Sequence, residues 1–296
     1  MLSFLPWWIL IFITVPLFFS ITAFIGGSIF VLGVFKFLLP FALFTTVFNF
    51  FINALWRGWA LFNLVAINLT NPVEWQIDSP DKFNKKSWYL LICNHISWVD
   101  IMVLTQVALN TLPSPKFFLK DELKKAPFVG MAAWAMDMPF MKRYSRSYLE
   151  KHPEKKGQDI ESTRRSCEKF KNIPTTIINF VEGTRLTKEK LLKSNSPFEH
   201  LLTPKAGGIA FTLSAMGHLF SGVINVTLNY PDNKTPTKDI LFGELKRVQV
   251  QIELLEVNDN IVGDYFNDGA FKSRFQSWLN TVWTEKDKLL AKLNNS

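Results

Sequence analysis

Hydrophobic and polar positions divide the chain into an apolar N-terminal part and a mixed remainder. Residues 1–35 contain no charged side chain, and after Lys36 a second apolar run extends from Phe37 to Trp56. A helix needs about 20 apolar residues to cross a bilayer, so these runs are long enough for two membrane helices. From Asn71 onward, charged residues recur as in an ordinary globular domain. The pattern predicts membrane-anchoring helices in residues 1–70 and a globular domain in residues 71–296.

The two apolar runs are expected to form a helical hairpin. Gly26, Gly27 and Pro40 offer places for a bend, and the hairpin either spans the bilayer or dips into it from one face. A cleaved signal peptide would have a basic start and an apolar core of roughly 7 to 15 residues, which does not describe this segment. Two buried helices of a soluble core are the remaining alternative.

In the globular part, apolar runs alternate with helical patterns. Apolar or β-branched runs predict strands at residues 89–93, 116–120, 138–141, 175–181, 223–230 and 247–257. Helical patterns cover residues 100–107, 130–135, 159–171 and 206–216, and another helix starts near residue 121. In the C-terminal segment, aromatic residues such as Phe271, Phe275 and Trp283 recur at helical spacing and pack on the sheet, or alternatively lie on a membrane surface. Strands alternating with helices predict an α/β domain.

The run 89–93 stops abruptly on polar residues that include His95. Ser97 can cap a following helix, which places His95 and Asp100 in the turn between strand and helix, where open α/β sheets bind ligands. Their side chains can meet there. A carboxylate that holds one ring nitrogen equips a histidine to act as a general base toward a hydroxyl. A helix-capping aspartate beside a surface histidine is the alternative.

Further candidates for binding follow other strands. The strand 175–181 runs into Glu182, Gly183, Thr184 and Arg185. Gly183 permits a tight turn, and Arg185 can hold a phosphate through two parallel hydrogen bonds. Glu182 could accept hydrogen bonds from substrate hydroxyls, or form an ion pair with Arg185 or a nearby lysine.

Cations also end two of the predicted strands. Lys120 closes the segment 116–120, and Lys142 and Arg143 follow the segment 138–141. A cation at a strand end suits an anionic ligand. The alternative for Lys142 and Arg143 is a solvated basic loop that continues into the polar residues 144–158.

The charge of the chain narrows the class of partner. The net charge of +8 and pI near 9.4 favour an anionic partner, such as a phospholipid surface, a phosphorylated substrate, an acidic carrier or nucleic acid. No recognised nucleic-acid motif occurs, and the membrane segment argues against that partner. Cys93 and Cys167 are the only cysteines, without metal-ligand spacing, so we expect no metal site and a reducing cytoplasmic setting.

The segment Asn94–Asp100 resembles the first motif, HX4D, of the glycerolipid acyltransferases. Residues 127–130 and 140–143 are similar to the second block, whose terminal arginine corresponds to Arg143, and residues 180–185 match the third block at every defining position. The fourth block usually contains a proline in its strand. Here residues 223–228 lack it, which resembles the YihG-like subgroup of the 1-acylglycerol-3-phosphate acyltransferases.

The resemblance implies a mixed, largely parallel sheet flanked by helices, with the membrane hairpin before it. It implies that His95 and Asp100 act on an acceptor hydroxyl and that Lys120, Lys142, Arg143 and residues 182–185 bind substrate. The implied reaction moves a fatty acyl group from acyl-CoA or an acyl carrier protein to the sn-2 hydroxyl of lysophosphatidic acid, giving phosphatidic acid. The implied location is the bacterial inner membrane, with the catalytic domain in the cytoplasm and membrane phospholipids around the hairpin.

Several alternatives to this reaction stay open from the sequence. The acceptor could be another lysophospholipid, or the protein could bind lipid without turnover. No cofactor is expected beyond the thioester co-substrate. Acyl transfer needs a base, donors for the oxyanion and cations for the acceptor, but no protein nucleophile. Cys93 is a poor nucleophile candidate because it closes a buried apolar run, where a thiol is usually inert.

Overall fold

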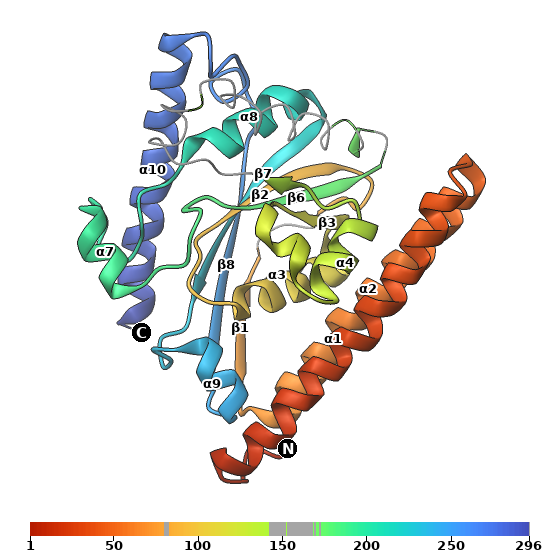
Figure 1. Ribbon diagram of the computed structural model, residues 1–296. Helices are drawn as coiled ribbons and strands as arrows, with labels where there is room; N and C mark the ends of the chain where they lie inside the picture. The colour runs from red at the N-terminus through yellow and green to blue at the C-terminus, as the bar shows by residue number, and fades with distance from the viewer. Residues whose placement is uncertain (80–82, 142–151, 153–167, 169, 172, 296) are drawn as a thin grey trace.

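Two long helices form a hairpin along one side of the molecule (Figure 1). The computed structural model describes residues 1–79, 83–141, 152, 168, 170–171 and 173–295. Helix α1 (Trp7–Leu38) and helix α2 (Ala42–Thr70) are joined by three residues that include Pro40. Gly26 and Gly27 lie inside the continuous helix α1, so the chain reverses at Pro40 alone. Helix α2 extends well beyond Arg57, because one arginine does not interrupt a helix.

The hairpin has one face on the protein and one face exposed. Phe18, Ile25 and Trp56 belong to a core cluster that also contains residues of the central sheet. Large apolar side chains on the outer face are between 62% and 78% exposed; they are Phe12, Phe19, Phe24, Phe37, Leu43 and Phe50. Helices of a soluble core would bury such residues, so this distribution contradicts the soluble alternative. Both helices are long and apolar enough to cross a membrane.

Lys36, the charge between the two apolar runs, is neutralised by the globular part. Its ammonium group donates to Oδ2 of Asp137 at 2.6 Å and to the carbonyl oxygen of Ala135 at 2.8 Å. A third bond, to Oδ1 of Asn49 at 3.2 Å, joins it to α2. The ion pair therefore ties the far end of the hairpin to the globular part.

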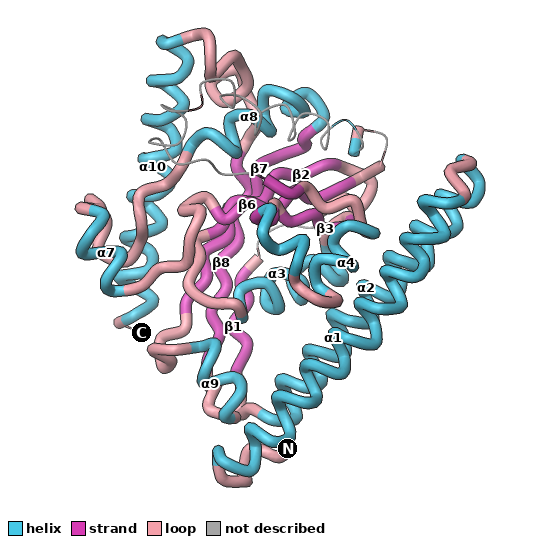
Figure 2. The backbone as a smooth tube through the Cα atoms, viewed as in Figure 1, coloured by secondary structure: helices cyan, strands magenta, loops and turns pink. Residues whose placement is uncertain are grey.

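A six-stranded sheet forms the centre of the globular part (Figure 2). Its order is β1-β8-β7-β2-β6-β3, and every neighbouring pair is parallel except β7 and β8. The strands are β1 (Glu74–Asp78), β2 (Trp88–Cys93), β3 (Ser114–Phe117), β6 (Thr175–Phe180), β7 (Phe220–Asn229) and β8 (Arg247–Leu255). The mixed, largely parallel sheet expected from the resemblance is confirmed.

Strand β2 lies in the middle of this sheet with helices on both of its faces. Tyr89, Leu91 and Cys93 belong to the core cluster on the side of the hairpin. Leu90 and Ile92 belong to the cluster on the opposite side. Because both faces are covered, the strand is apolar throughout instead of alternating.

Helices α3 (Val99–Thr111) and α4 (Val129–Ala135) lie on the hairpin side, and α8 (Ala206–Met216) and α10 (Gly269–Asn294) lie on the other side (Figure 1). Phe271, Phe275 and Trp283 of α10 are buried in the second core cluster, which confirms that this face packs on the globular part. The short helices α7 (Lys188–Ser194) and α9 (Pro236–Phe242), like strand β1, were not predicted.

The expectation of one strand at 116–120 was wrong. Strand β3 ends at Phe117, and β4 (Leu119–Lys120) pairs with β5 (Phe140–Met141) in a separate two-stranded sheet. Leu119 donates its N–H to Pro139 instead of to the large sheet, because the chain turns away after Phe118. The segment after residue 120 is a 3₁₀ helix, η1 (Asp121–Lys125). The predicted loop 144–158, apart from residue 152, and most of the predicted helix 159–171 lie outside the described residues.

Candidate active site

Four parallel strands deliver side chains to one edge of the sheet. Strands β3, β6, β2 and β7 are neighbours with the same direction, so their carboxyl ends meet. Residues 118–120 follow β3, residues 182–185 follow β6, His95 follows β2 and Tyr230 follows β7. The carboxyl edge of an open α/β sheet is where ligands usually bind.

His95 and Asp100 are in direct contact, as predicted. The distance from Nδ1 of His95 to Oδ2 of Asp100 is 2.8 Å, and the side chains are 15% and 0% exposed. The carboxylate is an acceptor, so Nδ1 carries a proton and Nε2 is left as a base. The same Oδ2 accepts the backbone N–H groups of Ile96, at 2.7 Å, and Ser97, at 2.9 Å.

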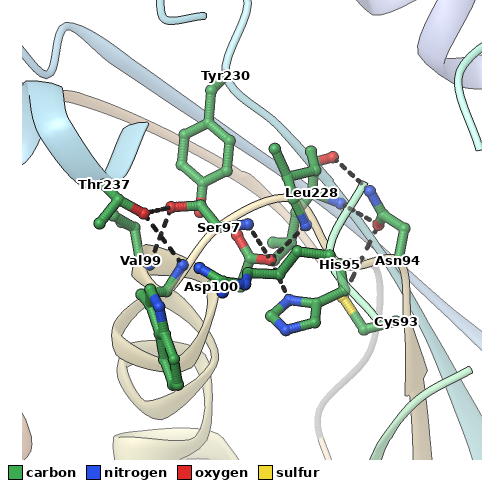
Figure 3. A network of polar contacts seen from close by, with 12 residues as sticks. Cys93, Asn94, His95, Ser97, Val99, Asp100, Leu228, Tyr230 and Thr237 are labelled. Carbon is green, nitrogen blue, oxygen red and sulfur yellow. Dashed lines mark hydrogen bonds and ion pairs between the residues drawn. The ribbon is translucent and has the colours of Figure 1, made fainter. Parts of the chain in front are cut away.

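Asp100 is also held from a strand that the sequence did not connect with it. Tyr230 donates its hydroxyl to Oδ1 of Asp100 at 2.8 Å (Figure 3). Burial and the neighbouring Asp100 raise the pKa of Tyr230 well above its usual value, so the phenol remains a donor. Both carboxylate oxygens therefore have fixed partners, and Asp100 cannot rotate without breaking several hydrogen bonds.

The turn that carries His95 is fastened on both sides. The side-chain amide of Asn94 donates to the carbonyl oxygen of Leu228 at 3.0 Å and accepts the Leu228 N–H at 2.9 Å (Figure 3). On the other side, Leu186 donates its N–H to the carbonyl oxygen of His95 at 2.7 Å. The hydroxyl of Ser97 accepts the Val99 N–H at the start of α3. These bonds hold the His95 backbone between β7 and the segment after β6.

The imidazole of His95 faces a cavity of about 480 Å³. Its ring stacks on Phe180, with 4.0 Å between centroids and 18° between planes. The predicted candidates Lys120, Gly183, Thr184 and Arg185 line the same cavity, together with Trp98, Glu122 and Lys190. Four of the predicted binding residues thus lie around the same cavity as His95.

Arg185 and Lys190 bring positive charge to this cavity. The guanidinium carbon of Arg185 lies 4.8 Å from the ring centroid of Trp98, which places the cation over the indole face. Gly183 has a φ of 71°, a conformation that glycine adopts without strain, and its N–H closes the turn onto Phe180 at 2.9 Å. Gly183 thus performs the turn role that its residue type predicts.

Glu182 departs from the expectation that it meets the substrate. It is 1% exposed and does not line the cavity. Burial is the main cause that raises its pKa to about 8, and the buried Lys286 of α10 counteracts the shift. Lys286 donates to the carbonyl oxygen of Val226, and burial lowers its pKa to about 8. Within the described residues, no ion pair joins Glu182 to Arg185.

Cys93 is fully buried beside the site. Its sulfur lies 3.8 Å from Oδ1 of Asn94, and burial raises the pKa of the thiol well above its usual value. A thiol that stays protonated is a weak nucleophile. This environment agrees with the expectation that Cys93 is structural.

Three contributors to the site were missed from the sequence. Tyr230 and Trp98 were not distinguished from other aromatic residues, and Lys190 belongs to a helix that was not predicted. The only available signal was their position after strand ends or beside a motif. Lys142 and Arg143 lie outside the described residues.

A second, apolar cavity of about 120 Å³ lies next to the first. The two share Ile101, Phe117 and Leu119 in their linings. Trp56 and Trp59 of α2 line the second cavity, as do residues of α4. The His95 cavity and the apolar cavity at the hairpin thus adjoin at these three residues.

Comparison with known proteins gives a consistent family match. A family model described as Acyltransferase matches residues 74–224, slightly more than half of the chain. Lysocardiolipin acyltransferase 1 of Mus musculus is 26% identical over 288 residues, which cover 89% of this chain and 69% of that protein. A 2-acyl-1-lysophosphatidylinositol acyltransferase of Saccharomyces cerevisiae is 24% identical, and the alignment covers 70% of this chain and 62% of that protein.

Two further comparisons extend this result. The 1-acyl-sn-glycerol-3-phosphate acyltransferase delta of Homo sapiens is 23% identical, covering 70% of this chain and 53% of that protein. The chain thus spans about half to two thirds of the length of these relatives. The crystal structure of the acyltransferase PlsC from Thermotoga maritima superposes with a TM-score of 0.56 at 16% identity, covering 97% and 96% of the two chains. At this identity, the similarity to PlsC shows a shared fold and nothing about the reaction.

Proposed function

We propose a reaction for this chain, which belongs to the Acyltransferase family. It transfers a fatty acyl group from a thioester donor to the sn-2 hydroxyl of 1-acylglycerol 3-phosphate, giving phosphatidic acid. The observation that carries the proposal is the 2.8 Å contact between His95 and Asp100, at a cavity that Arg185 also lines. A base for a hydroxyl and a cation for a phosphate are thus available in one space.

His95 acts as the general base. Its Nε2 removes the proton of the acceptor hydroxyl as the oxygen attacks the thioester carbonyl carbon. The carbon–sulfur bond then breaks, and the leaving thiolate takes the proton back from the imidazolium. Asp100 keeps the ring in one tautomer and stabilises its cationic form in between. The protein forms no covalent bond to the acyl group.

The acceptor is positioned through its phosphate. Arg185 binds two phosphate oxygens, and Lys120 adds a second positive charge from β4. Lys142 and Arg143 remain candidates for the same role on the basis of sequence. The glycerol backbone is short, so a fixed phosphate restricts the hydroxyl to the neighbourhood of His95, which lowers the entropic part of the barrier.

The hydrocarbon part of a lipid substrate is accommodated by the apolar cavity and the hairpin. The cavity of about 120 Å³ begins at residues shared with the His95 cavity and reaches α1 and α2. A hairpin embedded in the membrane would let lipid substrates enter without leaving the bilayer. We place the chain in a bacterial inner membrane with the globular part in the cytoplasm, where acyl-CoA and acyl carrier protein donors occur.

An acyltransferase for a different lysophospholipid is the second candidate. Two similar proteins favour it, because they are a lysocardiolipin and a lysophosphatidylinositol acyltransferase. The purified full chain should be assayed with labelled acyl-CoA and acyl carrier protein donors against a panel of lysophospholipids. The highest kcat/KM is expected for lysophosphatidic acid. A higher value for a phosphodiester acceptor would favour the second candidate, and lipid binding without any turnover would contradict an enzyme.

A further inference from the structure

Lys190 is anchored at the cavity that contains His95. From the short helix α7, its Nζ donates to Oγ1 of Thr184 at 2.6 Å and to the carbonyl oxygen of Arg185 at 3.0 Å. Thr187 caps this helix by accepting the Lys190 backbone N–H at 3.2 Å. An ammonium group has three N–H donors, and these described contacts use two of them. A ligand oxygen can therefore take the third.

The ammonium of Lys190 bonds to the backbone of Arg185, and both side chains line the same cavity. Arg185 is oriented by Trp98, and the residue after it donates to the carbonyl oxygen of His95. Two hydrogen bonds to backbone carbonyl oxygens thus link these positions. Lys190 bonds to Arg185, and Leu186 bonds to His95. A molecule bound in this cavity between Arg185 and His95 occupies the space that Lys190 also lines.

Lys193 of the same helix is not arranged in this way. Lys193 forms an ion pair with Glu189 at 2.5 Å, with both side chains about three quarters exposed, and it does not line the cavity. Among the described residues that line the cavity, Lys120, Arg185 and Lys190 are positive and Glu122 is negative. The positive charge of these side chains is therefore larger than a ligand with a single negative charge would neutralise.

The two headgroup classes of lysophospholipids differ in charge. A phosphomonoester carries roughly −1.5 to −2 near pH 7, because its second pKa is about 6. A phosphodiester lacks the second ionisation and carries one negative charge. Arg185 alone can match one charge through a bidentate contact. A second cation in the same cavity is therefore attracted more strongly to a phosphomonoester than to a phosphodiester, because only the monoester carries the additional negative charge.

We propose that Lys190 is a specificity-determining residue that binds the acceptor phosphate and favours a phosphomonoester over a phosphodiester acceptor. This inference rests on the proposed function, since it concerns the same cavity and the same acceptor. Lys190 acts by direct contact with the phosphate, in addition to supporting the turn at residues 184–185.

The test compares two acceptors in the full-length protein in detergent micelles. Initial rates are measured for lysophosphatidic acid and lysophosphatidylglycerol at a saturating donor concentration, for wild type, Lys190→Met, Lys190→Arg and the control Lys193→Met. For Lys190→Met we expect kcat/KM for lysophosphatidic acid to fall about tenfold, mainly through KM, as expected for a lost bond to a charged group. For lysophosphatidylglycerol it should fall by less than about threefold. If lysophosphatidylglycerol binds without turnover, its inhibition constant against lysophosphatidic acid is compared between the variants instead of its KM.

The control and the conservative variant separate binding from support of the turn. Lys193→Met should match wild type for both acceptors, and Lys190→Arg should keep most of the preference because the charge remains. An equal loss for both acceptors in Lys190→Met would show that Lys190 only supports the turn and would overturn the inference. An unchanged KM for lysophosphatidic acid, or a defect confined to the donor KM, would also overturn it.

Failure of the proposed function has a separate signature. A wild-type enzyme that acylates only phosphodiester acceptors contradicts the proposed function before any variant is measured, and the role of Lys190 is then overturned as well. A wild-type enzyme that prefers lysophosphatidic acid, combined with an equal loss in Lys190→Met, leaves the proposed function intact and removes only the inference. Thermal unfolding of each variant checks that the fold is unchanged.

Discussion

Tyr230 donates its hydroxyl to Oδ1 of Asp100 at 2.8 Å, although the two residues are 130 positions apart in the chain. The other oxygen of the carboxylate bonds to the ring of His95. Asp100 therefore joins the end of β7 to the turn after β2. The orientation of the proposed base depends on a strand that contributes no residue to the HX4D motif.

The first prediction concerns Tyr230→Phe. Removing the hydroxyl leaves Oδ1 of the buried Asp100 without this donor, and a hydrogen bond to a charged group is worth about 1.5–3 kcal/mol. We expect kcat to fall by roughly tenfold while the acceptor KM changes little, because the phosphate contacts remain. Tyr265→Phe is the matched control. Tyr265 is also buried and accepts a bond from Gln276 at 2.9 Å, but it does not line the cavity. An equal loss of kcat in both variants would contradict the positioning role.

The second prediction separates the roles of His95 and Asp100. His95→Ala should abolish turnover without changing the fold, because the imidazole is at the cavity and the strand before it is unaffected. Asp100→Asn should lose most of the rate while acceptor binding persists, since an amide can orient the ring but cannot stabilise its cation. Single-turnover assays and acceptor binding measure the two effects. Rates close to wild type in folded His95→Ala would exclude the general-base assignment.

The third prediction concerns Arg185→Lys. Lysine keeps the charge but loses the planar, bidentate contact and the stacking on Trp98. We expect the acceptor KM to rise about tenfold, with a smaller change in the donor KM. Arg247→Lys is the control, because Arg247 also makes a bidentate contact, to Asp232, but does not line the cavity. A defect in the donor KM alone would reassign Arg185 to the donor.

The fourth prediction concerns the pH dependence of stability. Burial raises the pKa of Glu182 from 4.5 to about 8, so between these values the folded protein binds more protons than the unfolded chain. The free energy of unfolding must then decrease as pH rises from 5 to 8, on the order of a few kcal/mol from this group. Glu182→Gln should flatten this part of the curve. The lowered pKa of Lys286 acts in the opposite direction, but only above pH 8.

The measurement for Glu182 is the melting temperature of both proteins at several pH values in one detergent. Glu182 interacts electrostatically with Lys286 and Asp100, which are unchanged in the variant. Parallel curves for wild type and Glu182→Gln between pH 5 and 8 would show that Glu182 is ionised in the folded protein throughout this range.

The fifth prediction concerns Cys93→Ser. The thiol is buried, its pKa is raised, and the proposed reaction requires no protein nucleophile. We expect kcat within about twofold of wild type and a lower melting temperature, because a hydroxyl replaces a thiol in an apolar environment. Complete loss of acyl transfer in a folded Cys93→Ser protein would instead support covalent catalysis by Cys93.

Sequence reasoning found the parts of the site that depend on neighbouring residues. The 89–93 run, the turn after it and the pairing of His95 with Asp100 involve positions close in the chain, so residue type and spacing were sufficient. Gly183 and Arg185 were likewise recognisable beside their strand. The continuous apolar character of β2 is typical of a strand with both faces covered, because a strand with one exposed face would alternate.

The tertiary structure decided how distant segments meet. The run 116–120 divides between two sheets because Leu119 pairs near Pro139, a partner that local pattern does not reveal. Glu182 is buried near Lys286 of the last helix, which no motif connects with it. Tyr230 and Lys190 join the site through contacts across 130 residues and from a short, unpredicted helix. Residue patterns determine local conformation and which surfaces are apolar, whereas the partner of a buried polar group depends on strand order and packing.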